Sequence, residues 1–217
     1  MSFFYGASQP LNIKSTGYKP FDQIDFLHKA ATGRSIKSGS FRLTGKINVL
    51  KTTTASATWS LVVPEDQVFF DPYAGVSSVL KNATTEVNNR IIESIAYLNR
   101  HTAMVSQANN TLEQLTSNSN NVLELKGLQN NVSISSASDD DGANFSILLN
   151  TAINKSSTDL PASKFNLIKL SFTLASALEC LYSTRVGINP ADALFITGLD
   201  YIINDLELHW YETIETP

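Results

Sequence analysis

Cysteine is almost missing from this chain of 217 residues, in which Cys180 is the only one. A single thiol excludes an intramolecular disulfide, and it excludes a metal site made of cysteine ligands. Apolar and small residues surround Cys180, so we expect it to be a small buried residue of the core.

Charge is also scarce. Charged residues make up 17% of the sequence, against about 25% in average proteins. Hydrophobic residues make up 42%, which is enough for a core and excludes wholesale disorder. Serine, threonine and asparagine take the place of charge, and such a surface is typical of secreted domains, adhesins and packed assemblies, where charge would be desolvated at contacts.

Long hydrophobic runs are lacking as well. No window approaches the ~20 apolar residues of a membrane-spanning helix. The first residues lack the basic region and apolar core of a signal peptide. We therefore expect neither a transmembrane segment nor a signal peptide.

No catalytic motif is present. The three histidines are far apart in the sequence, and neither a Gly-x-Ser-x-Gly elbow nor a glycine-rich phosphate loop occurs. The one acidic run, Asp139–Asp141, precedes Gly142 but lacks the alternation of an EF-hand loop, which favours a solvated loop tip over a calcium site. We expect no enzyme, no cofactor and no metal. A carbohydrate-active enzyme stays as an alternative, motivated by Trp59, Trp210 and scattered carboxylates.

What the sequence does contain is alternation of apolar and polar residues, which is typical of half-buried β-strands. The clearest strands cover residues 41–49, 168–174 and 206–210. We expect the last one to extend over about 199–211, with Ile202 and Trp210 on its apolar face. These patterns predict a mainly β protein with an antiparallel sandwich.

Two helices are expected beside the strands. Apolar residues from Ile91 to Val105 follow the helical period, so we predict an amphipathic helix over about 88–106. A short helix is expected near 175–182. We expect residues 1–22 to form an extended arm and residues 23–217 to form a single domain, with long polar loops within 106–164.

Basic residues concentrate near the start. Residues 1–51 hold eight of the 16 basic residues but two of the 20 acidic ones, so their net charge is +6, and the remaining residues carry −10. One end of the protein is therefore expected to face phosphate, in lipid headgroups or nucleic acid. The alternative is a basic strand edge that deters aggregation. The candidate membrane- or genome-facing residues are Lys14, Lys19, Lys29, Arg34 and Lys37.

The order of these segments resembles a known family. Asp71-Pro-x-Ala-Gly75 is followed by Ile92-Glu-Ser-Ile-Ala-Tyr97, then by an apolar strand that begins near Lys164, a short helix and Pro190. This order is similar to that of the upright jelly-roll capsid proteins of icosahedral DNA viruses, the group of adenovirus-like and tailless membrane-containing phage capsids. The resemblance covers roughly residues 22–212. Such capsid proteins often carry two jelly rolls, whereas this chain has room for one.

The resemblance implies a jelly-roll sandwich that serves as a structural subunit of an icosahedral shell, as a capsomer or a vertex (penton) protein. The partners it implies are copies of the chain in a trimer, pentamer or hexamer, other capsid proteins, and an internal membrane or genome reached by the N-terminal arm. The expected location is the virion. A receptor-binding or fibre-type β-sandwich is the alternative.

Overall fold

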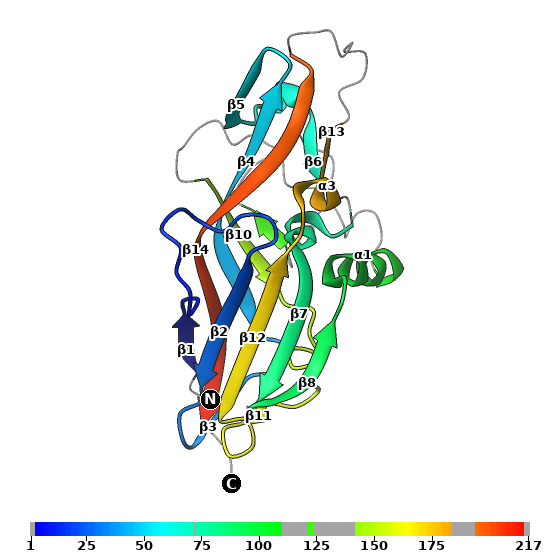
Figure 1. The fold of residues 1–217 in the computed structure, drawn as a ribbon. Helices are drawn as coiled ribbons and strands as arrows, with labels where there is room; N and C mark the ends of the chain where they lie inside the picture. The colour runs from blue at the N-terminus through cyan, green and yellow to red at the C-terminus, as the bar shows by residue number, and fades with distance from the viewer. Residues whose placement is uncertain (1–2, 72, 110–120, 124–141, 184–193, 215–217) are drawn as a thin grey trace.

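A computed structural model describes residues 3–71, 73–109, 121–123, 142–183 and 194–214. Most of these residues lie in strands, and each strand pair of the described part is antiparallel. Two sheets pack against each other, as Figure 1 shows. The expected mainly β, antiparallel sandwich is confirmed.

Eight strands form the larger sheet. They run in the order β11 (Leu160–Pro161), β3 (Arg34–Ile36), β14 (Ile196–Ile214), β4 (Arg42–Thr53), β10 (Ala143–Leu148) and β9 (Asn121–Leu123), with β1 (Phe3–Ser8) on β14 and β5 (Ser56–Leu61) on β4. The second sheet contains β2 (Gln23–Lys29), β12 (Leu167–Leu174), β7 (Leu80–Val87) and β8 (Arg90–Ile95). A separate ribbon pairs β13 (Leu181–Ser183) with β6 (Val68–Phe70). The helical segments are η1 (Pro64–Asp66), η2 (Gly75–Val79), α1 (Leu98–Asn109) and α3 (Ala177–Cys180).

Eight of these strands pair in a nested order along the chain. β1 pairs with β14, β2 with β12, β4 with β10, and β7 with β8, so that the first strand of the eight meets the last and the fourth meets the fifth. The four pairs are divided between the two sheets, β1-β14-β4-β10 and β2-β12-β7-β8. This wrapping of antiparallel pairs is the jelly roll.

The core lies between the two sheets and follows from alternation. β12 buries every second residue from Ile168 to Leu174, and β4 does the same from Leu43 to Ile47 before burying both Asn48 and Val49. Within the second sheet Phe172 meets Phe26 of the neighbouring strand β2 edge to face, with ring centroids 6.3 Å apart, and between the sheets His28 of β2 meets Trp210 of β14 with ring centroids 4.4 Å apart. Full burial of a side chain of this size contributes about 2 kcal/mol, so the matching apolar faces hold the sheets together.

The helix expected over 88–106 is wrong in its first half. Asn88 and Asn89 have φ values of 51° and 63°, and they form the two-residue turn between β7 and β8. Two left-handed residues suit the tight turn of a hairpin, and asparagine tolerates that conformation. The chain therefore returns as strand β8, and the helix α1 begins only at Leu98. The short helix expected near 175–182 is confirmed as α3, with fewer residues.

One face of the last strand also differs from the expectation. A bulge between Asn204 and Glu207, with Asp205 at a φ of 50°, shifts the register of β14 against β4. An extra residue in one strand reverses the faces on either side of it. Tyr201 and Ile203 are therefore buried before the bulge, whereas Ile202, expected on the apolar face, is only half-buried.

The first 22 residues, expected as an arm, lie against the sandwich in their described part. Residues 3–8 form β1, and Tyr18 is 3% exposed. The backbone of Tyr18 exchanges two hydrogen bonds with Ile203, at 2.7 and 2.8 Å. Within 106–164, where long loops are expected, the described part contains β9, β10 and β11 as well as the end of α1.

Part of the larger sheet projects beyond the second sheet. The end of β4, the strand β5 and the start of β14 rise above the sandwich together with the β6–β13 ribbon (Figure 1). Because the second sheet ends lower, both faces of β5 are exposed and Trp59 is 48% exposed. This projection carries apolar side chains that the core does not cover.

Candidate functional surface

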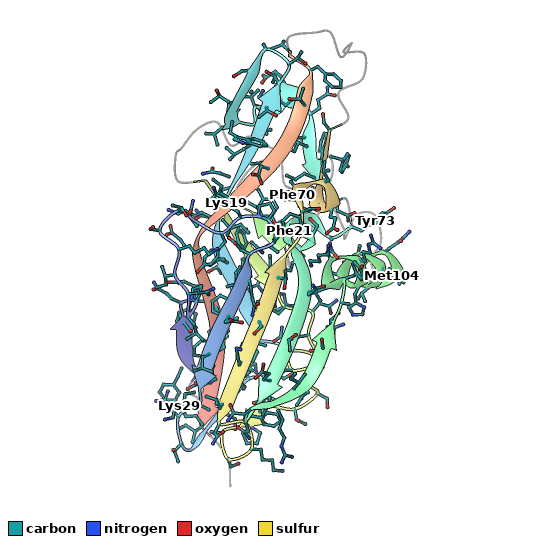
Figure 2. All side chains as sticks on the ribbon, viewed as in Figure 1. Lys19, Phe21, Lys29, Phe70, Tyr73 and Met104 are labelled. Carbon is teal, nitrogen blue, oxygen red and sulfur yellow. The ribbon has the colours of Figure 1, made fainter. Side chains whose placement is uncertain are left out.

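The five basic residues predicted to face a membrane or a genome do not form one surface. Lys14 and Lys19 precede β2, Lys29 ends that strand, and Arg34 and Lys37 follow it. A strand of seven residues spans roughly 20 Å. The residues therefore form two groups at opposite ends of β2, and Figure 2 shows Lys19 and Lys29 at these two ends.

Asp22 binds both residues of the first group, Lys14 and Lys19. The Nζ of Lys14 lies 2.6 Å from Asp22, and the backbone N–H of Lys19 donates to the same carboxylate at 2.8 Å. Partial burial acts to raise the pKa of Asp22, but the hydrogen bonds from Lys14 and Lys19 outweigh it and the pKa is lowered. The carboxylate stays charged and fixes the loop before β2, which leaves Lys14 40% exposed.

The second group is partly tied to the last strand. Arg34 donates to Glu212 at 3.1 Å, and its guanidinium lies 4.1 Å from the ring centroid of Phe4. The backbone N–H of Lys37 donates to the carbonyl of Tyr211 at 2.8 Å. Arg34 therefore serves contacts within the fold, a role that its position in the sequence does not reveal.

Exposed apolar side chains accompany the first group. Leu11 is 60% exposed, Ile13 69% and Phe21 67%. The backbone N–H of Leu11 donates to the carbonyl of Asp25 at 2.8 Å, which places this segment along the free edge of β2. The sequence analysis did not single out these residues, although apolar residues and lysines alternate there.

Phe21 also has an unusual backbone. Its φ is 71°, in the left-handed region that bulky side chains rarely adopt. That conformation costs about 1–2 kcal/mol for a residue with a Cβ, and the exposed ring gains no burial that would offset it. The backbone N–H of Phe21 donates to the carbonyl of Leu174 at 3.2 Å, so β12 holds this conformation while the ring stays outside the core. Figure 2 shows Phe21 beside Lys19 where the chain enters β2.

A second set of exposed apolar residues lies on the projection above the sandwich. Leu178 of α3 is 84% exposed and Tyr182 of β13 is 37% exposed. A hollow of about 280 Å³ lies between Leu178, Ser183 and residues 195–199. Large exposed apolar areas with polar surroundings are typical of protein contacts.

Other residues considered from the sequence have structural places or fall outside the described part. Cys180 is buried, and burial raises the pKa of its thiol. Trp210 is 7% exposed and belongs to the core, so it offers no open platform for a sugar. Asp139–Asp141 lie outside the described residues.

The described residues contain neither a metal-binding cluster nor a membrane-spanning helix. No group of three or more His, Cys, Asp or Glu side chains is placed to hold a metal ion there. Within the same part of the chain, no helix has the length and apolar character needed to cross a membrane.

Comparison with known proteins connects the fold to viral shells. No family model and no curated protein match the sequence. The Faustovirus major capsid protein matches with a TM-score of 0.55 and 10% identity, over 100% of this chain and 55% of that one. A chain in the cryo-EM structure of the Sputnik virophage matches with a TM-score of 0.54 and 8% identity, over 99% of this chain and 48% of that one.

The likeness establishes the fold. The protein is a jelly roll of the kind found in the Faustovirus major capsid protein, and the fold expected from the resemblance is confirmed. The chain spans about half the length of the solved structures it matches. It contains one nested set of eight strands in its described part.

Proposed function

We propose that the chain is a structural subunit of an icosahedral viral capsid and that it acts in the virion. The observation that carries this proposal is the match to the Faustovirus major capsid protein, which extends over the whole of this chain. The low content of charge supports it, because weakly charged surfaces lose little solvation at contacts between copies. With one jelly roll, the chain would act as a capsomer or vertex subunit and bind copies of itself.

We place one contact between copies on the projection above the sandwich. Leu178 is the most exposed large apolar residue of the described part, and it borders the hollow at residues 195–199. A neighbouring copy would cover it. Many weak contacts of this kind add up in a closed shell, because each copy is held at several points.

Electron microscopy and analytical ultracentrifugation of the purified chain test this function. We expect rings or closed particles, and we expect Leu178→Asp to reduce them to small species. Ile91→Asp is the matched control, because Ile91 is 67% exposed on β8, borders neither of the hollows that Leu178 lines, and should leave assembly unchanged. A chain that stays monomeric at every concentration, and that binds glycans on an array, would instead favour a receptor-binding module.

We further propose that the segment before β2 contacts a lipid membrane rather than a genome. Lys19 supplies positive charge, whereas the charge of Lys14 is balanced by Asp22, and a lysine near an anionic membrane contributes about 1 kcal/mol. Leu11, Ile13 and Phe21 supply apolar groups beside them. A nucleic acid backbone would use the lysines but would leave these three apolar side chains in water.

Sedimentation with vesicles of phosphatidylserine and phosphatidylcholine tests this contact. The double variant Ile13→Ser/Phe21→Asn should lose most of the binding, and asparagine suits the left-handed backbone at Phe21. Lys29→Ser is the matched control at the other end of β2 and should bind like the unchanged protein. Equal loss in both variants would contradict the proposed surface. Binding to DNA without binding to vesicles would favour the genome.

A further inference from the structure

A buried cluster joins the two sheets beneath the N-terminal strand. The carboxylate of Glu212 accepts two hydrogen bonds, from Nη1 of Arg34 at 3.1 Å and from Nε1 of Trp210 at 3.0 Å. Glu212 is 7% exposed, so its charge is held almost entirely by these partners. Arg34 comes from β3 and the other two residues from β14, so the cluster already ties two strands of the larger sheet.

His28 reaches the same cluster from the opposite sheet. It lies on β2, is 4% exposed, and meets Trp210 edge to face with ring centroids 4.4 Å apart. Among the described residues its Nε2 has no hydrogen-bond partner, and it lies 3.7 Å from Oε1 of Glu212. That separation is too long for a hydrogen bond. A buried imidazole nitrogen therefore faces a carboxylate without binding it.

The N-terminal strand covers this cluster. In the register of β1 against β14, Phe4 lies opposite Glu212 and Gly6 opposite Trp210. The guanidinium of Arg34 lies over the ring of Phe4, and the indole of Trp210 fills the space that a Cβ on Gly6 would need. Within the part of the chain that the structure describes, β1 pairs with β14 alone, so it is an edge strand whose inner face rests on the cluster.

We propose that β1 is released from the sandwich in mild acid and that protonation of His28 triggers the release. The inference rests on the packing of this edge and does not depend on the proposed capsid role. A proton on Nε2 creates a cation that attracts Oε1 of Glu212. When Oε1 moves toward His28 to close the 3.7 Å gap, it leaves Nε1 of Trp210. The side chains of Trp210 and Glu212, on which Gly6 and Phe4 pack, then change position.

The direction in which pH changes the attachment of β1 follows from the proton affinities of His28 in the attached and released states. Burial lowers the pKa of His28, and the charge of Glu212 opposes that effect only in part. A histidine that is solvated after release recovers a pKa near its ordinary value of about 6.5. The released state therefore binds the proton more strongly. β1 is therefore attached most strongly above about pH 6.5, and its attachment weakens as the pH falls below that value.

A second histidine contacts β1 from the outer face of β14. His209 stacks on Tyr5 with ring centroids 5.3 Å apart, and its Nδ1 forms a hydrogen bond with the hydroxyl of Tyr5. Burial also lowers the pKa of His209, with opposition from Glu207. The other groups that face it are Thr44, whose Oγ1 lies 2.7 Å from Nε2, Glu207 at 3.4 Å, and Arg42, which is opposite it on β4.

His209 is the matched comparison for His28. It also contacts β1, but its outer position leaves it less buried, since its side chain is 14% exposed against 4% for His28. The effect of its protonation should therefore be smaller. Glu212 and Arg34 are the only charged partners that the structure gives for the His28 cluster within the described residues.

Hydrogen exchange of the full chain, followed by mass spectrometry from pH 7.5 to 5.0, measures the release. Protection factors remove the intrinsic dependence of exchange on pH. We expect protection of residues 3–8 to fall by about tenfold for each unit by which the pKa of His28 is lower in the attached state. Residues 56–61 of β5 are an internal control, because among the described strands β5 pairs only with β4, away from the cluster, and their protection should stay constant.

Three variants separate the possible causes. In His28→Gln, the protection of residues 3–8 should no longer fall strongly as the pH is lowered. In His209→Gln, that fall in protection should remain. Glu212→Gln should deepen the fall in protection at low pH, because the charge that raises the pKa of His28 in the attached state is gone and that state then binds the proton even more weakly. Unchanged protection in β4 and β12 verifies that each variant is folded. Protection that stays flat in the unchanged protein, or that falls equally in His28→Gln, overturns the proposal. A fall that vanishes in Glu212→Gln but persists in His28→Gln would assign the trigger to Glu212 and also overturn it.

Discussion

The side chain of Asn154 binds the backbone of Phe41 as a neighbouring strand would. Its Oδ1 accepts the N–H of Phe41 at 2.8 Å, and its Nδ2 donates to the carbonyl of Phe41 at 3.1 Å. A third bond joins Nδ2 to the carbonyl of Leu149 at 2.9 Å. Asn154 is 5% exposed, so these bonds lie away from water and hold the chain where it enters β4.

Asn154→Ala should therefore destabilise the fold strongly. It leaves the buried N–H of Phe41 without its acceptor, and we expect a loss of about 3 kcal/mol in the free energy of unfolding. Urea unfolding followed by circular dichroism measures the change. Asn82→Ala is the control, because Asn82 is more exposed and its Oδ1 accepts one bond, from the N–H of Tyr97. Equal losses in the two variants would show that burial does not decide the effect.

The turn between β7 and β8 is sensitive to the residue at its second position. Asn89 has a φ of 63°, so Asn89→Gly should be nearly neutral, whereas Asn89→Ala should cost about 1 kcal/mol because a Cβ strains this backbone. Thermal unfolding of the pair checks the order. A helical segment over these residues would give the reverse order, since alanine favours a helix and glycine weakens it.

Lys51 and Asp66 form an ion pair that is screened from water. Their side chains are 14% and 2% exposed, and Nζ lies 2.5 Å from the carboxylate. Asp66 also accepts the backbone N–H of Val63 at 2.8 Å, so the pair ties β4 to the turn at η1. Asp66→Asn should cost about 3 kcal/mol or more, because it leaves a buried ammonium without its partner.

A more exposed pair provides the comparison. Lys81 and Glu179 lie 2.8 Å apart with side chains that are 24% and 30% exposed. Glu179→Gln should cost less than about 1 kcal/mol, since water screens the charges of such a pair. The midpoints of urea unfolding of the two variants give the difference between their losses in unfolding free energy, provided that the slopes of free energy against urea concentration are equal. Similar midpoints would mean that the Asp66 carboxylate is better solvated than its burial indicates.

Residues with a regular burial pattern were predictable from the sequence. In the strands at 41–49 and 168–174 apolar and polar residues alternate because one face of each strand meets the core. The burial of most of their residues can therefore be predicted from the local sequence. The same holds for Cys180, whose apolar neighbours in the sequence are enough to indicate burial. The short helix α3 was found from a similar local pattern.

The errors arose where the backbone departs from regular geometry. Ile91, Ile92 and Ile95 fit a helical spacing, yet a left-handed turn at Asn88 and a bulge place them on a strand with two of the three well exposed. The bulge at Asp205 likewise changes which residues of β14 are buried. One extra residue reverses a strand face, and the amino-acid pattern does not mark its position.

The partners of the basic residues depend on the topology. Lys14 and Lys19 lie in an exposed segment, whereas Arg34 binds Glu212, which is 178 residues away in the sequence. Such a partner depends on the topology, so charge counting over residues 1–51 does not reveal it. The exposed position of Phe21 also depends on its backbone, which the sequence pattern does not show.

Two truncations distinguish the detachable part of the N-terminus from the part that belongs to the core. Deletion of residues 1–8 removes β1, an edge strand with one partner, and should leave the domain folded. Deletion of residues 1–22 also removes Tyr18, which is 3% exposed, exchanges two backbone hydrogen bonds with Ile203 and donates its hydroxyl to the carbonyl of Asn12 at 2.8 Å.

The longer deletion should lose about 4 kcal/mol, from the buried aromatic ring and the two backbone bonds. Urea unfolding of both truncated chains and of the point variant Tyr18→Ala measures this difference. Tyr18→Ala should account for most of the loss, because the ring covers the core beside the bulge of β14. If both deletions unfold at the same urea concentration as the full chain, the whole segment 1–22 is a separable arm and Tyr18 contributes nothing to the core.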